Sequence, residues 1–192
     1  MRVFEEAVLF ALKHHAGQTR KRSDNPYILH PMEVATIAAS LTEDEDVLSA
    51  AVLHDTVEDT DATIEEIREK FGKRIALLVM TETEEKRPDV PPEQTWLVRK
   101  EETLLMLENT KDSGVRILWL SDKLANMRSF ARQYREQGDA LWQDYNQKDP
   151  AMQAWYYYSI ARYLQPLRDT DAYQEYVSLV NEVFQNQNGG EL

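Results

Sequence analysis

The sequence contains no cysteine. This absence excludes disulfide bonds, thiolate zinc sites and cysteine nucleophiles together, so any metal ion must be held by histidine nitrogens and carboxylate oxygens. A chain without cysteine also fits a reducing compartment, and we expect a cytoplasmic location.

Long apolar runs are missing as well. No run approaches the roughly 20 residues that a membrane-spanning helix needs. The first segment, MRVFEEAVLFALKHH, lacks the basic start, long apolar centre and small-residue cleavage site of a signal peptide. We therefore expect a soluble, unexported protein with no membrane partner.

Basic residues are scarce: 22 Lys and Arg stand against 34 Asp and Glu, which gives a net charge of −12. Binding to nucleic acid needs a basic surface, so nucleic acid is not an expected partner. A small polyanion remains possible where a local basic cluster meets a bound cation. The densest basic run is Arg20-Lys21-Arg22.

The helical period dominates what is present, and no convincing period-two strand occurs. The 192 residues predict one all-α domain over residues 1–185, with a frayed tail at 186–192. Thr63 and Glu66 have the spacing of a capping box at a helix start. Loops are expected at 19–29 and 82–93, and helices at 3–16, 30–41, 45–55, 63–80, 93–109 and 114–134, with two or three more in 139–186.

Histidines and carboxylates form a candidate metal site. His30 opens one predicted helix, and the adjacent pair His54-Asp55 lies near the end of another. Neighbouring side chains on a helix point about 100° apart, so both members of the pair can reach an ion beside it. Asp122 lies within an apolar helical run, where an unpaired carboxylate is costly to bury. Two nitrogens and two oxygens suit Mn²⁺, Fe²⁺, Co²⁺ or Zn²⁺, and ligand type alone does not choose among them.

Further polar residues extend this candidate site. If the helix continues past Asp55, Glu58 and Asp59 lie one turn beyond the His-Asp pair and can orient or deprotonate a water molecule. Asn126 and Ser129 follow Asp122 by four and seven residues, so the three share one helical face. That face can present a metal ligand, an amide and a hydroxyl to one extended ligand.

Three blocks of the sequence resemble the hydrolase domain of the RelA/SpoT family. These blocks are HAGQTRKRSDNPYILHPMEVA at 15–35, AAVLHDTVEDT at 50–60 and ILWLSDKLANMRSF at 117–130. They occur in the family's order, and we expect no synthetase domain after them. The resemblance is therefore to the small stand-alone alarmone hydrolases, which include the metazoan SpoT homologue.

The resemblance implies an HD-domain helical bundle that removes the 3′-pyrophosphate of ppGpp or pppGpp, giving GDP or GTP and pyrophosphate. It implies one Mn²⁺ as cofactor and a small-molecule nucleotide as the partner. The implied roles are metal binding for His30, His54, Asp55 and Asp122, catalysis for Glu58 and Asp59, and substrate binding for Arg20, Lys21, Asn126 and Ser129.

Two other interpretations remain open. In the first, the same site acts on another nucleotide, such as an adenosine alarmone or the 2′-phosphate of NADPH. Alternatively, the domain is a catalytically silent module that binds a nucleotide or a protein partner. The acidic pair Glu58-Asp59 argues against a silent module, because a pure binder does not need it.

Overall fold

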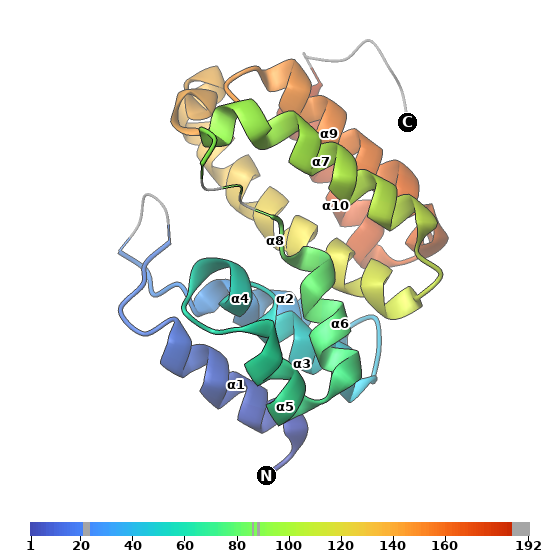
Figure 1. Ribbon diagram of the computed structural model, residues 1–192. Coiled ribbons are helices and arrows are strands. Elements are labelled where there is room, and N and C mark those ends of the chain that lie inside the picture. The colour runs from blue at the N-terminus through green and yellow to red at the C-terminus, as the bar shows by residue number, and fades with distance from the viewer. Residues whose placement is uncertain (21–23, 86, 88, 186–192) are drawn as a thin grey trace. The chain divides into compact units, whose positions relative to one another are not determined.

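The computed structural model describes residues 1–20, 24–85, 87 and 89–185, and these residues fold into α-helices with short 3₁₀ segments. They contain no β-strand, only an isolated bridge between Thr19 and Pro26, so the all-α prediction is confirmed. None of the described helices is both long enough and apolar enough to cross a membrane. In chain order (Figure 1) the elements are α1 Val3–His14, α2 Leu29–Ala39, α3 Glu45–Leu53, α4 Thr56–Asp59, α5 Ile64–Phe71, α6 Lys73–Glu82, α7 Pro92–Asn109, α8 Ser113–Gln137, η1 Gly138–Asp144, α9 Pro150–Tyr163, η2 Gln165–Leu167 and α10 Asp171–Phe184.

The elements group into two compact units. The first unit comprises residues 1–84 and 112–125, and the second comprises 85–111 and 126–192. Helix α8 contributes its first half to the first unit and its remainder to the second.

Helix α3 is the centre of the first unit, and α1, α2 and α6 all pack against it. Its Ala50 and Ala51 are fully buried, as are Val52 and Leu53. Small side chains allow neighbouring helices to approach closely, while the larger ones fill the remaining space at close-packed density. The last residue of α3 is followed directly by His54, so the central helix delivers that histidine to the interior.

One helix that the sequence predicts as continuous is divided in the structure. The prediction of one helix over 63–80 is wrong, because α5 ends at Phe71 and α6 begins at Lys73. The intervening Gly72 has φ 93°, a left-handed conformation that glycine adopts without a Cβ clash. The capping box before α5 is confirmed: Thr63 Oγ1 accepts from the Glu66 amide at 3.2 Å, and Glu66 Oε2 accepts from the Thr63 amide at 2.8 Å.

Aromatic side chains form the core of the second unit, in which α9 packs against α7 and α10 (Figure 1). Trp142 stacks on Phe184 with ring centroids 5.2 Å apart, and Tyr157 stacks on the same ring at 5.8 Å. Helices α9 and α10 confirm the prediction of further helices after residue 139. The predicted tail, 186–192, lies outside the described residues.

Candidate metal centre

Three buried side chains from three helical elements converge in the first unit. His30 lies in the first turn of α2, His54 caps the C-terminus of α3, and Asp122 lies in the middle of α8. One ligand atom from each lies within 4.8 Å of the others. Their exposed fractions are 4%, 1% and 4%, respectively. Residues far apart in the sequence thus place two imidazoles and a carboxylate at one interior point.

Asp55 adds a second carboxylate to this group. Its Oδ2 lies 3.1 Å from His54 Nε2 and 3.5 Å from His30 Nε2. Asp122 Oδ1 lies 3.0 Å from His30 Nε2 and 3.5 Å from His54 Nε2. The structure therefore brings together all four residues that the sequence singles out as metal ligands.

The histidine geometry fits a metal ligand. His54 Nδ1 lies 2.9 Å from the carbonyl oxygen of Ala51, which acts only as an acceptor, so Nδ1 carries the proton of the neutral ring. In the neutral ring that a metal ligand requires, Nε2 carries the lone pair, and this atom is fully buried without a well-formed hydrogen bond among the described residues. A histidine that donates one nitrogen to a carbonyl and directs the other at a cation is the usual arrangement of a ligand.

The charges within the cluster shift one another's pKa values. Burial lowers the pKa of His54, but the carboxylates of Asp55 and Asp122 outweigh it and hold that pKa well above its ordinary value. Burial raises the pKa of Asp122, yet the Lys123 ammonium and the two imidazoles hold it well below its usual range. Burial acts likewise on Asp55, where His54 and His30 lower the pKa. Without a cation, the cluster is therefore stabilised by protonated imidazole between ionised carboxylates.

Tyr27 connects the cluster to the acidic pair. Its hydroxyl donates to Asp55 Oδ2 at 2.6 Å and lies 3.2 Å from Asp59 Oδ2. Burial and the neighbouring Asp55 raise the pKa of Tyr27, so the phenol stays protonated and remains a donor. The guanidinium of Arg20 lies over the Tyr27 ring, 5.6 Å from its centroid. Sequence reasoning missed Tyr27, although its position three residues before His30 was a usable signal.

The acidic pair lies on α4, a separate short helix. The helix predicted through Asp55 ends at Leu53, so Glu58 and Asp59 do not continue α3. The Asp59 amide still donates to the Asp55 carbonyl at 2.9 Å, which keeps the two residues one turn apart. Half-buried Glu58 accepts from the Glu84 amide through Oε2 at 3.2 Å, whereas Asp59 is exposed. Both carboxylates thus have defined anchors beside the cluster.

A lysine and a second buried carboxyl lie behind Asp122. Lys123 Nζ donates to Asp122 Oδ2 and lies 3.4 Å from Glu82 Oε2. Burial raises the pKa of Glu82 to about 8 despite the neighbouring ammonium. Sequence analysis missed both residues. It assigned Glu82 to a loop, whereas α6 includes it as its last residue.

The predicted substrate-binding residues have different placements. Arg20 is half-buried in the loop before α2, and Lys21 lies outside the described residues. Asn126 and Ser129 follow Asp122 on the same continuous helix, α8, as predicted. The Ser129 hydroxyl accepts from Gln133 Nε2 at 3.0 Å.

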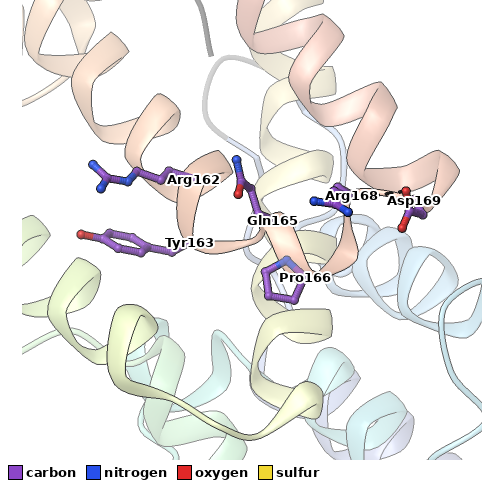
Figure 2. A pocket seen from close by; sticks show the side chains of 6 residues that line it. All are labelled: Arg162, Tyr163, Gln165, Pro166, Arg168 and Asp169. Carbon is purple, nitrogen blue, oxygen red and sulfur yellow. Dashed lines mark ion pairs between the residues drawn. The ribbon is translucent and has the colours of Figure 1, made fainter.

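A separate surface hollow of about 520 Å³ lies in the second unit, where α9 ends and η2 begins (Figure 2). None of the predicted site residues lines it, and the guanidinium of Arg168 lies 3.8 Å from the exposed carboxylate of Asp169. We assign no function to this hollow. Its lining consists of Arg162, Tyr163, Gln165, Pro166, Arg168 and Asp169.

The family model for the HD domain matches residues 7–147. A guanosine-3′,5′-bis(diphosphate) 3′-pyrophosphohydrolase of Aquifex aeolicus is 42% identical over 125 residues, which are 65% of this chain and 17% of that protein. A GTP pyrophosphokinase of Streptomyces coelicolor is 40% identical over 137 residues, 71% of this chain and 16% of that protein. The chain thus spans about a sixth of the length of these curated relatives.

Two solved structures are also similar. A metazoan orthologue of SpoT that hydrolyses ppGpp aligns with a TM-score of 0.70 and 26% identity, covering 98% of this chain and 97% of that one. A protein of Listeria monocytogenes EGD-e aligns with a TM-score of 0.70 and 30% identity, covering 81% of this chain and 99% of that one. The family match covers the cluster residues His30, His54 and Asp122 and the acidic pair Glu58-Asp59. The chain therefore belongs to the HD domain family, and its predicted resemblance to the RelA/SpoT-type hydrolases is confirmed.

Proposed function

We propose that the chain is a metal-dependent hydrolase that removes the 3′-pyrophosphate from ppGpp or pppGpp. The observation that carries this proposal is the cluster of two imidazoles and two carboxylates with the anchored pair Glu58 and Asp59 beside it. The pyrophosphohydrolase activity in the name of the Aquifex relative and the ppGpp hydrolysis by the metazoan orthologue support the substrate.

His30, His54, Asp55 and Asp122 would hold the cation, and we propose Mn²⁺. Imidazole nitrogen and carboxylate oxygen suit this ion, which accepts both donor types and retains open positions. When bound, such a cation lowers the pKa of water and neutralises phosphate charge.

The chain's own residues are proposed to transfer the proton during the reaction. In this proposal Glu58 and Asp59 accept a proton from the attacking water, and their contacts with the Glu84 amide and the Tyr27 hydroxyl support the role. The water oxygen forms a bond to the phosphorus that carries the 3′-oxygen, and the bond from phosphorus to that oxygen breaks. The acidic pair returns the proton taken from the water to the departing 3′-oxygen, so the nucleotide leaves with a 3′-hydroxyl and the products are GDP or GTP and pyrophosphate.

Substrate recognition is proposed to depend on local positive charge. The net charge of −12 repels a polyphosphate unless its approach is locally positive. Arg20 lies over Tyr27, whose hydroxyl contacts Asp55, and this places one cation of the basic run beside the cluster. Together with Lys21, it would bind the nucleotide, while Asn126 and Ser129 would present hydrogen-bonding groups from α8. We also propose that residues 1–185 act as one HD-type domain in the cytoplasm.

A substrate panel tests this proposal directly. The purified protein with Mn²⁺ would be given ppGpp, its adenosine analogue and NADPH, with pyrophosphate and orthophosphate release measured separately. We expect pyrophosphate and GDP from ppGpp. Orthophosphate release from NADPH alone, preference for the adenosine analogue, or no turnover of any substrate would overturn the assignment.

A further inference from the structure

The two oxygens of Asp122 face different neighbours. Oδ1 faces the imidazoles, 3.0 Å from His30 Nε2 and 3.5 Å from His54 Nε2. Oδ2 accepts from the ammonium of Lys123, the next residue along α8. The ammonium therefore lies on the side of this carboxylate that is turned away from the histidines.

Lys123 is itself held in place. Its Nζ lies 3.4 Å from Glu82 Oε2 and 4.4 Å from the ring centroid of Trp119. The exposed fractions of the Lys123 and Glu82 side chains are 13% and 3%. An ammonium this deeply buried incurs a large desolvation cost, and its contacts with Asp122, Glu82 and Trp119 offset that cost only in a well-fixed geometry. The ammonium accordingly has little freedom to leave Asp122.

Charge neutralisation alone does not explain this arrangement. Once a divalent cation binds Oδ1, the cation itself compensates the carboxylate, and a nearby ammonium repels it. The lysine thus works against metal affinity by its charge. What it contributes is control over the second oxygen of Asp122, because outer hydrogen bonds orient the ligands that contact a metal.

We propose that Lys123, anchored by Glu82, positions Asp122 so that it offers one oxygen rather than two to the cation. This proposal rests on the metal site of the proposed function. An octahedral ion has about six positions, and one atom from each of four residues leaves roughly two. A second Asp122 oxygen would leave about one, too few for both a water molecule and a phosphate oxygen. Lys123 is thus a positioning residue that preserves an open coordination position.

The test counts the water molecules on bound Mn²⁺ from solvent-proton relaxation, which needs no substrate. In Lys123→Met we expect the count to fall by about one while Mn²⁺ affinity is kept or increased, because Asp122 gains a second contact. We also expect kcat to fall by roughly 10- to 100-fold, the range found when an outer partner of a ligand is lost. An unchanged count, or a higher count that shows loss of Asp122, would overturn the proposal.

Three variants complete the test. Lys123→Arg retains a donor for Oδ2 and should keep the unmodified water count; a count as low as in Lys123→Met would contradict positioning by the donor. Arg74→Gln is the matched control, because it removes a cation of the same unit that contacts Asp44 and Asp112 but no cluster residue. Its water count should not change. If Lys123→Met fails to fold, the double variant Glu82→Leu with Lys123→Met replaces the whole buried pair with apolar groups, a change that proteins often tolerate. The number of water molecules on Mn²⁺ should fall in this variant as well.

The outcomes separate this inference from the proposed function. An unmodified protein that binds no Mn²⁺ refutes the metal site itself. An unmodified protein that binds Mn²⁺, together with a folded Lys123→Met variant of unaltered water count, refutes only the role of Lys123.

Discussion

Replacement of Glu58 by glutamine separates proton transfer from structure. Glu58 Oε2 accepts the backbone amide of Glu84 at 3.2 Å, and a glutamine carbonyl oxygen can accept the same bond. A hydrogen bond to a charged acceptor contributes about 1.5–3 kcal/mol and a neutral one about 0.5–1.5 kcal/mol, so the expected loss of stability is only about 1 kcal/mol. The fold should therefore survive this change.

Catalysis should respond far more strongly. Loss of general acid–base help lowers turnover by roughly 10²–10⁴-fold, which corresponds to about 3–5 kcal/mol of barrier. The effect on the reaction is thus several times larger than the effect on folding. Pyrophosphate release from ppGpp at saturating Mn²⁺ measures the loss of turnover, and denaturant unfolding measures the loss of stability.

Glu66→Gln is the matched control for Glu58→Gln. Glu66 Oε2 also accepts a backbone amide, that of Thr63 at 2.8 Å, but it does so in the capping box of α5. The control should lose comparable stability and keep full turnover. Metal content, measured by atomic spectrometry, should be unchanged in both variants. If Glu58→Gln loses its metal but has normal turnover once Mn²⁺ saturates, Glu58 is a ligand and the reasoning is refuted.

Three further predictions concern metal, pH and recognition. His54→Ala should lose bound metal and activity together, and a chelator should abolish turnover until Mn²⁺ is restored; full turnover by verified metal-free protein would exclude a metal mechanism. In metal-free protein the pKa of His54 is raised on folding, so its stabilisation is complete below the ordinary value of 6.5 and is lost as pH rises through the folded-state pKa. Calorimetry with chelator should show Tm falling in that alkaline direction, with a smaller slope in His54→Gln; equal slopes would contradict the ion pairs. Arg20→Ala, Lys21→Ala and Asn126→Ala should each raise KM for ppGpp with metal content intact, each lost charged contact costing about 1–3 kcal/mol; unchanged KM in all three would remove the recognition model.

The sequence predicted what is encoded locally. The capping box at Thr63 depends on short-range hydrogen bonds, and the helix start beside Pro31 depends on the fixed proline geometry. Both can be recognised from a few neighbouring residues. The four cluster residues were also identifiable: the helix positions of His30 and of the His54-Asp55 pair favoured a shared ion, and Asp122 lies in an apolar run where an unpaired carboxylate is costly to bury.

The missed features depend on three-dimensional neighbours. Gly72 reads as an ordinary residue within a helical pattern until packing places α6 against α3. Glu82 follows a helix and precedes charged residues, so its letters suggest a surface loop. Its burial depends on the packing of helices that brings in neighbours such as Lys123, 41 residues further along the chain. Likewise, the position of Tyr27 three residues before His30 indicates that it lies near the site, but its contacts with Asp55 and Asp59, which are 28 and 32 residues away in the sequence, follow only from the fold.

The bond from His54 Nδ1 to the Ala51 carbonyl joins the cluster to the end of α3. The last carbonyls of a helix have no intrahelical amide partner, and here the imidazole occupies one of them. A ring fixed at its other nitrogen therefore also restrains the terminal turn of the central helix against fraying. When a cation binds, the last turn of α3 should become more rigid. The amides of α3 should then be better protected from hydrogen exchange.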